Sequence, residues 1–490
     1  MMLVLGLTLL SPLIVGYLIA RSLLPAYKPA WAGVLLTTSL GAGLGVGALS
    51  FVFFLTRLLV GPSTAAALTS ELLLAGISGA ACWVTRNREE VKIPGGTPSG
   101  WSWLLPAALL VAASMALALF LDTSAADPYG NWDAWAIWNL RAKLLAQQDS
   151  SWRNAFSTAL NQLAGAGATH GDYPLLLSGY IARCWSLLGS VDDTTVPIAV
   201  AGLFSFATVG LMVGGLAVLR GWSAATLGGM VLLGTAAFLL DSSWQFADVP
   251  LGFYYLAVLI LFFLVMGSQS TSGLHVLAGL ALGCAAWTKD EGMLFALVAG
   301  GSFLASLLVS RKTGRNKTLV LLAAGALPAL AIVLYFKIFL APKGSSWGPL
   351  TLSVALHNLA NPSRYARILR AIWDEVLQLG TGIAHPLIYL TILAICLGVP
   401  RDRLRQPVVV ASCAALLITF AGYCFMYTVT PYSLDWQLGT SLGRLLIQLV
   451  PSGIFLCMAV FRTAEETAIQ AAPSGRKSEK KRAAKSRTGR

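Results

Sequence analysis

The stretch Asp127-Pro-Tyr-Gly-Asn-Trp-Asp-Ala-Trp-Ala-Ile-Trp-Asn-Leu-Arg-Ala-Lys143 stands apart from the rest of the chain. It combines acids, cations and three tryptophans at a spacing of three residues, and long apolar runs lie on both sides of it. It belongs to a polar segment, residues 122–172, that is long for a connection between membrane helices. Long connections inside a folded unit usually carry function. We therefore expect the chemistry of this protein in residues 122–172.

The apolar runs around this stretch decide the fold class. Of the 490 residues, 56% are hydrophobic and 11% are charged, which leaves too little polar surface for a water-soluble globule. Apolar runs of about 20 residues recur, which is the length of helix that crosses a bilayer core. The pattern predicts an all-α polytopic membrane protein with 13 or 14 transmembrane helices. The expected spans are residues 2–21, 31–55, 64–85, 102–121, 195–219, 223–240, 248–266, 273–288, 292–310, 318–340, 384–400, 406–428 and 444–461, with 173–189 as a fourteenth span or a re-entrant segment.

The basic residues predict the orientation in the membrane. The formal net charge is +13, and the basic side chains cluster at residues 86–92, 311–317, 401–405 and 476–490. Because basic loops stay on the cytoplasmic side, residues 122–172 and 341–383 should lie on the non-cytoplasmic face. The protein itself is expected in the plasma or inner membrane of the cell. Residues 463–490 are expected to be a disordered cytoplasmic tail that contacts anionic lipid rather than nucleic acid.

The two long external loops each show a helical pattern. Trp135, Trp138, Ala142 and Leu145 recur at helical spacing, which predicts a helix in the membrane interface with its indoles at headgroup depth. In the second loop, Arg364, Arg367 and Arg370 share one helix face. Two interpretations stay open for these arginines: a surface helix facing solvent or lipid, or a clamp for a lipid-linked phosphate.

Ionisable residues at the outer ends of the expected spans are the candidate site. They are Asp127, Asp133, Asp172, Asp248, Lys289 and Arg444. Charges at membrane depth are costly and usually functional. Each residue also has a simpler interpretation, as a helix cap for the acids or as an interfacial anchor for the cations. Together, carboxylates can accept a proton and cations can hold an anionic leaving group, a combination that suits group transfer from a lipid phosphate.

The sequence assigns no cofactor with certainty. All seven cysteines lie in apolar runs without a C-x-x-C pair, which predicts neither a disulfide framework nor a zinc site. No residue is assigned to a metal. A divalent cation stays possible, because the sequence shows no oxygen cage that decides it.

Four short motifs follow one another along residues 100–460 and carry a family resemblance. They are Asn131-Trp-Asp-Ala-Trp-Ala-Ile-Trp138, Asp172-Tyr-Pro-Leu-Leu176, Ala247-Asp-Val-Pro-Leu251 and Thr288-Lys-Asp-Glu-Gly292. In this order they resemble the GT-C superfamily of membrane glycosyltransferases. The nearest branch is the bacterial one related to protein mannosyltransferases and lipid A aminoarabinose transferases. The chain departs from the family at Ala134, where Glu is frequent, and in having Tyr-Pro-Leu in place of Tyr-Pro-Pro.

The resemblance implies an architecture and a function. Residues 101–462 would form a GT-C-like catalytic membrane domain, and residues 1–100 would add extra N-terminal transmembrane helices. The donor would be a polyprenyl-phosphate-linked sugar, and an unidentified glycan, lipid or protein would accept the sugar on the non-cytoplasmic face. A transporter or flippase of a lipid-linked or anionic substrate is the alternative. The implied catalytic residues are Asp133, Asp172 and Asp127, and the implied substrate- or phosphate-binding residues are Lys289, Arg444, Arg364, Arg367, Asp248, Tyr173 and Trp135.

Overall fold

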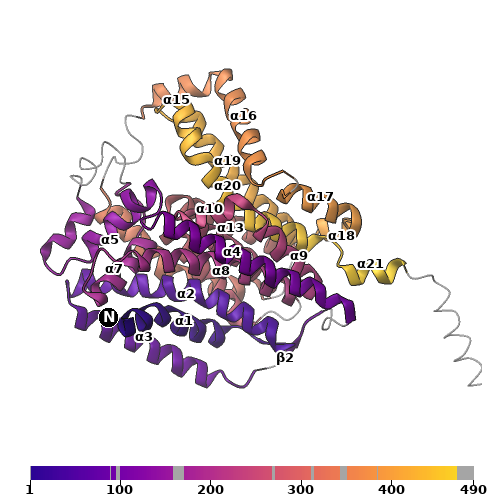
Figure 1. Cartoon of the computed structure of the whole chain (residues 1–490), viewed down its shortest axis with the longest axis horizontal. Coiled ribbons are helices and arrows are strands. Elements are labelled where there is room, and N and C mark those ends of the chain that lie inside the picture. The colour runs from indigo at the N-terminus through magenta and orange to yellow at the C-terminus, as the bar shows by residue number, and fades with distance from the viewer. Residues whose placement is uncertain are drawn as a thin grey trace, which may run out of the picture.

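The protein is a polytopic helical membrane protein. The structure is a computed structural model that describes residues 2–88, 90–94, 100–157, 170–267, 271–310, 314–342, 350–382 and 384–471. Within these residues, ten helices are long and apolar enough to cross a membrane, or eleven if one bent pair counts as a single span. The long helices lie side by side in one bundle, with α15 and α16 projecting from it (Figure 1).

Ten of the predicted spans are continuous helices of sufficient length. Each begins or ends within about ten residues of the expected boundary. The ten are α1 (Met2–Leu23), α2 (Ala30–Leu59), α3 (Thr64–Val84), α4 (Leu104–Ala126), α8 (Thr195–Arg220), α11 (Asp248–Met266), α13 (Asp290–Val309), α14 (Arg315–Tyr335) with its π-helical continuation η4 (Phe336–Leu340), α19 (Pro407–Val429) and α20 (Leu434–Val460).

The other three predicted spans are helical but short or broken, which corrects the expected count of 13 or 14. The segment 223–240 is a pair, α9 (Trp222–Leu233) and α10 (Ala236–Ser243), bent by 64°. The break falls at Gly234 and Thr235, and the Thr235 backbone is extended. The segments 273–288 and 384–400 form α12 (Ser272–Thr288) and α17 (Pro386–Leu397), which are shorter than a full crossing.

The uncertain segment 173–189 is a short helix inside the bundle. α7 (Leu176–Leu188) has buried side chains from Leu176 through Ser186. Ser178 donates to the Trp138 carbonyl, and Trp185 donates to the Asp193 carbonyl just beyond the helix. Both ends of α7 are therefore tied to neighbouring parts of the segment between α4 and α8, so α7 is not a fourteenth crossing.

The N-terminal helices belong to the same bundle as the rest. α2 packs against α1 on one side and against α8 and α7 on the other. At the end of the bundle away from α5 (Leu140–Leu145), a parallel pair of short strands, β1 (Ala26–Lys28) and β2 (Glu90–Lys92), joins the loops after α1 and α3 (Figure 1). The remaining short elements are η1 (Gly100–Trp103), η2 (Ala134–Asn139), η3 (Ser150–Phe156), α15 (Leu352–Leu359), α16 (Pro362–Gln378), α18 (Arg401–Leu404) and α21 (Ala464–Ala471).

The start of the expected tail is ordered. Residues 463–490 were expected to be disordered, but Ala464–Ala471 form α21. Its Glu466 lies 2.9 Å from Arg220, at the end of α8, and 2.7 Å from Arg403, in α18. This acid therefore neutralises part of the basic charge at that end of the bundle. Residues 472–490, the most basic part of the tail, lie outside the described residues.

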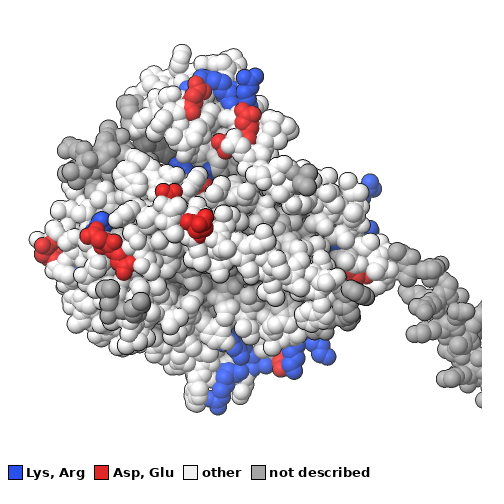
Figure 2. Space-filling view, viewed as in Figure 1, with Lys and Arg blue, Asp and Glu red and all other residues white. Residues whose placement is uncertain are grey.

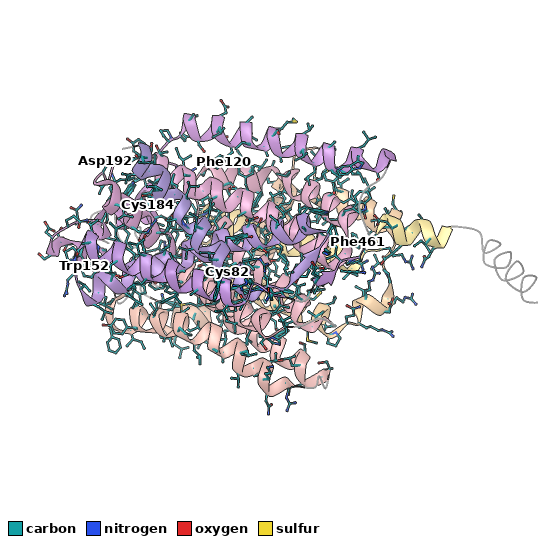
Figure 3. The ribbon with its side chains drawn as sticks, turned by 90° about the horizontal axis from the view of Figure 1, so that it is seen from below. Cys82, Phe120, Trp152, Cys184, Asp192 and Phe461 are labelled. Atoms are coloured by element: carbon teal, nitrogen blue, oxygen red, sulfur yellow. The ribbon has the colours of Figure 1, made fainter. Side chains whose placement is uncertain are left out.

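The two ends of the bundle differ in the residues they carry. Trp152, Cys184 and Asp192 lie near one end and Phe461 near the other (Figure 3). On the face shown in Figure 2, acidic side chains are scattered over the left and upper parts, basic side chains gather at the very top, and lysines and arginines dominate the lower edge. The candidate residues belong to the end that carries Trp152 and Asp192.

Candidate active site

A tight turn after α4 places Asp133. The backbone N–H of Asn131 donates to the Trp244 carbonyl at 3.1 Å, which fixes the turn to the segment between α10 and α11. Gly130 lies in the left-handed region, with φ of +70°, and a Cβ there would be 2.7 Å from the same carbonyl. Asp133 then directly precedes the π-helix η2, an element that often occurs at functional sites.

Arg444 is the partner of Asp133. Its Nη1 donates to Asp133 Oδ2, and its guanidinium lies 4.9 Å from the centre of the Phe246 ring. Both charged side chains are largely buried, at 19% and 15% exposure. The prediction that Arg444 begins the last helix was wrong, because α20 starts at Leu434. The polar residues 434–443 are helical and extend α20 beyond the apolar run.

Lys289 is the second cation of the site. It lies between α12 and α13, where its Nζ is 3.0 Å from Asp248 Oδ1 and 3.2 Å from Glu291 Oε1. Its ammonium also lies 5.6 Å from the centre of the Tyr173 ring. Burial alone would lower the pKa of Lys289, but the carboxylates of Asp248 and Glu291 outweigh burial and raise it. The two carboxylates therefore favour the charged form of this buried side chain.

Side chains from α20 and α19 hold Asp248 in place. Gln448 donates to Asp248 Oδ1 at 2.6 Å, and Tyr423 donates to the Gln448 side-chain oxygen at 2.6 Å. The Tyr423 hydroxyl is 3.0 Å from that of Tyr255, which donates to the Glu291 carbonyl at 2.9 Å. The Lys289–Asp248 pair thus sits beside a set of polar contacts contributed by four helices, α11, α13, α19 and α20. These contacts restrict the positions that the pair can take.

Asp172 forms a neighbouring ion-pair cluster with η4. Lys337 Nζ is 2.6 Å from Asp290 Oδ1 and 3.8 Å from Asp172 Oδ2, and it donates to the Asp172 carbonyl at 2.8 Å. Asp290 directly follows Lys289 in the sequence, so the two clusters touch. The structure therefore brings Asp133, Asp172, Asp248, Lys289 and Arg444 to one end of the bundle.

The aromatic helix faces inward, which corrects the predicted interfacial helix. Trp138, Ala142 and Leu145 are all 2% exposed or less. Trp138 stacks on Tyr173, and Tyr173 stacks on His170, with ring centres 5.6 and 4.6 Å apart. Three members of the predicted apolar face, Trp138, Ala142 and Leu145, pack on protein, whereas the fourth, Trp135, is exposed.

Arg141 holds the backbone of the two stacked residues Tyr173 and His170. It is 1% exposed and donates to the backbone carbonyls of Tyr173 and His170. These hydrogen bonds of the buried guanidinium fix the loop around Asp172 against α5. Of the tryptophans in this stretch, Trp132 and Trp135 are the exposed ones, at 42% and 49%.

Three other predicted residues lie away from the paired charges. Asp127 is exposed at the C-terminal end of α4. Arg364 donates to the Tyr427 and Thr430 carbonyls at the end of α19, at 2.9 and 3.3 Å. Arg367 pairs with Asp435 on the surface at 3.3 Å. The two arginines thus hold α16 on α19 and α20 in this structure.

α16 nevertheless reaches the site through another residue. A Cβ on Gly443 would lie 2.6 Å from a carboxylate oxygen of Glu375, so Glu375 sits directly against the residue before Arg444.

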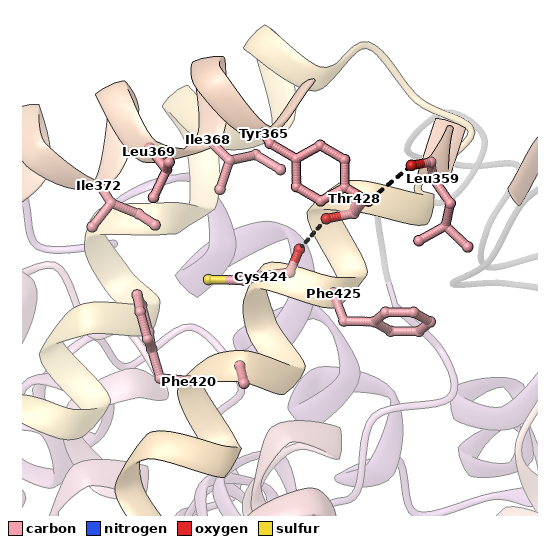
Figure 4. Close-up of a pocket in the computed structure, with 10 residues that line it drawn as sticks. Leu359, Tyr365, Ile368, Leu369, Ile372, Phe420, Cys424, Phe425 and Thr428 are labelled. Carbon is pink, nitrogen blue, oxygen red and sulfur yellow. Dashed lines mark hydrogen bonds between the residues drawn. The ribbon is translucent and has the colours of Figure 1, made fainter. Parts of the chain in front are cut away.

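The groove between α16 and α19 is apolar, has a volume of about 370 Å³, and is lined by side chains such as Ile368 and Phe420 (Figure 4). No group of three or more His, Cys, Asp or Glu side chains within the described ranges could hold a metal ion.

Sequence reasoning missed several members of the site. Lys337, Gln448 and Glu375 come from three different helices and belong to none of the four motifs, whereas Asp290 lies in the Thr288–Gly292 motif but was not singled out. Asp241 is the fifth, a 7% exposed acid in the last turn of α10. It occurs in the same polar break as Asp248, seven residues earlier, and that position was the available signal.

Comparisons with known proteins give only a distant likeness. No family model and no curated protein matches the chain. Two solved structures of ArnT from Cupriavidus metallidurans are similar to it. The apo structure has 14% identity and a TM-score of 0.38 over 71% of this chain, and the structure with undecaprenyl phosphate has 15% and 0.39 over 74%.

The chain spans 59–60% of the length of these ArnT chains. The functional assignment has to come from the side chains of this chain.

Proposed function

We propose that the protein is a glycosyltransferase that moves a sugar from a polyprenyl-phosphate-linked donor to an acceptor on the non-cytoplasmic face of the membrane. The observation that carries the proposal is the Asp133–Arg444 pair beside the Lys289–Asp248 pair. Two buried cations at one end of a membrane bundle can hold a phosphate whose lipid tail lies in the bilayer. The acids beside them can bind and activate the acceptor.

Arg444 is the proposed contact for the donor phosphate. A guanidinium can bind phosphate in bidentate fashion, and here Asp133 occupies it. An arriving phosphate would compete with Asp133 for Arg444 and release the carboxylate to orient the acceptor. The transferred sugar leaves a phosphate dianion behind, and fixed positive charge stabilises the transition state that forms it.

Lys289 supplies the second charge. Its ion pairs with Asp248 and Glu291 keep it protonated while fixing its position. Tyr173, whose ring faces this ammonium, would line the path of the sugar. Trp135, exposed on η2, would contact the lipid or the acceptor. Asp172 would act as the partner acid of Asp133. Asp127, exposed at the end of α4, is the remaining candidate acid.

The decisive experiment measures release of polyprenyl phosphate. Purified protein in detergent or lipid discs is incubated with a panel of polyprenyl-phosphate sugars and a membrane extract as the acceptor source. Release is expected from at least one donor. Arg444→Ala should abolish it, and Arg444→Lys should restore it only in part, because an ammonium cannot form the bidentate contact.

A matched control is available in the same helix. Gln437→Ala changes a polar residue of α20 that lies two turns before Arg444 and should leave release unchanged. If the wild-type protein releases polyprenyl phosphate from none of the donors, the proposal is wrong.

One observation favours the alternative of a transporter or flippase. Arg183 and Glu71 form a buried ion pair well inside the bundle, with two contacts of 2.6 Å, rather than at a helix end. Transporters often carry ionisable residues at such depth. This pair is saturated, however, because Arg183 also donates to the Thr8 carbonyl and the Ser11 hydroxyl. Transfer of a lipid-linked sugar across proteoliposomes without release of polyprenyl phosphate would support the alternative.

A further inference from the structure

Asp241 is a buried acid whose position is unfavourable for the stability of the folded protein. Its side chain is 7% exposed, and no cation within the described residues forms an ion pair with it. It also lies in the last turn of α10, where the helix dipole disfavours a negative charge. Acids that break several local rules at once are expected at functional sites.

The surroundings of Asp241 place it in the candidate active site. The charged groups that act on it are Asp248, Arg444, Glu375 and Asp133. The backbone confirms this neighbourhood, because the N–H of Phe246 donates to the Asp241 carbonyl and the Phe246 ring lies beneath the Arg444 guanidinium. Asp241 therefore lies beside the ion pairs of the site without belonging to either.

Ion pairing divides the acids of the site into two groups. Asp133 is held by Arg444, Asp248 by Lys289 and Gln448, and Asp172 by Lys337. A cation stabilises the charged form of a carboxylate and makes it a poorer proton acceptor. A buried carboxylate without a cation is the stronger base. Asp241 is such a carboxylate.

We propose that Asp241 is the catalytic base that removes the proton from the sugar acceptor. This rests on the proposed glycosyl transfer and deepens it. The acceptor oxygen or nitrogen forms a bond to the anomeric carbon, and the bond from that carbon to the phosphate oxygen breaks. Its electron pair leaves on the polyprenyl phosphate, and the acceptor proton moves to the Asp241 carboxylate. Asp133 then orients the acceptor and Arg444 holds the phosphate.

The test separates proton transfer from donor binding. Asp241→Asn should lower kcat for polyprenyl phosphate release by 10²–10⁴-fold, the usual contribution of a positioned base. Its Kd for polyprenyl phosphate alone should stay within twofold of wild type. The fall in wild-type rate at acidic pH should disappear in Asp241→Asn and persist in Asp241→Glu. Asp192→Asn, an exposed acid at the same end of the bundle, is the control.

Two results would overturn the assignment. One is an Asp241→Asn protein that retains more than half of the wild-type kcat. The other comes from a labelling experiment on the wild-type protein, which does not depend on the folding of a variant. Because a bound sugar donor should shield Asp241, dicyclohexylcarbodiimide is expected to modify Asp241 at least tenfold more slowly when the donor is bound. Equal labelling with and without donor places Asp241 outside the site. Inactivity of the wild type, by contrast, removes the proposed function itself.

Discussion

At the scale of single residues, the Asp133–Arg444 pair leads to a specific prediction. Asp133→Asn keeps an oxygen that can accept a hydrogen bond from Arg444. We therefore expect the variant to fold and to elute from size-exclusion chromatography at the same volume as the wild type. The loss of the carboxylate should reduce polyprenyl phosphate release by about 10²-fold, because a misplacement of the acceptor by about 1 Å can cost that much. Release rates and thermal unfolding of both proteins are the measurements. A variant with half the wild-type activity would move the role to Asp172 or Asp127.

A second residue-scale prediction concerns pH and His170. Burial lowers the pKa of His170, and this outweighs the carboxylates of Asp172 and Asp133, which raise it. The unfolded chain therefore binds a proton near pH 6.5 that the folded protein refuses, so stability is lost as the pH falls below about 6.5. His170→Asn, which tolerates the backbone φ of +41°, should remove this part of the pH dependence.

Thermal unfolding of the wild type and His170→Asn at pH 5 and pH 7.5 tests this. The wild type should lose more stability between the two pH values than the variant does. Identical losses in the two proteins would mean that His170 titrates normally.

Residue types at the candidate site were predictable, but their pairing was not. Asp133, Lys289 and Arg444 could be found because polar residues interrupt apolar runs there. Nothing in the sequence says that Arg444 meets Asp133, since 311 positions separate them and only helix packing joins them. Lys337 was missed for the same reason, whereas Asp241 was marked only by its place in the polar break that also holds Asp248.

At the scale of elements, close helix crossings depend on glycine. A Cβ on Gly16 of α1 would lie 1.8 Å from the Gly41 carbonyl oxygen of α2, so Gly16→Ala forces the helices apart. We expect a loss of about 1–3 kcal/mol, typical of overpacking. Gly6→Ala in the same helix meets nothing within 4 Å and should be neutral or slightly stabilising. Thermal unfolding in detergent compares the two, and equal melting temperatures would contradict the crossing.

Element existence was easier to predict than element surroundings. The thirteen expected spans all fall on helices, because the bilayer demands long apolar runs. The orientation of η2 and α5 was predicted wrongly, because an apolar face at helical spacing suits lipid and protein equally well. Trp138 packs on protein because Tyr173, which lies 35 positions further along the chain and itself stacks on His170, offers its ring as a stacking partner.

At the scale of the whole molecule, the structure places the proposed site and the basic loops at opposite ends. The Asp133–Arg444 pair, Asp172 and Lys289 lie at one end, whereas Arg220 and Arg403 meet Glu466 at the other. Since basic loops remain cytoplasmic, this arrangement favours an external site. It also suits a donor whose lipid tail stays in the membrane while its sugar faces outward.

Cysteine labelling in intact cells tests this topology. In a variant lacking the seven native cysteines, all of which are free thiols, a cysteine at exposed Ser150 should react with an impermeant maleimide from outside. A cysteine at exposed Arg405, at the opposite end, should react only after the membrane is permeabilised. The two positions control for each other, because each reports reagent access under both conditions. The reverse pattern would place the site in the cytoplasm, and an external acceptor would then be impossible.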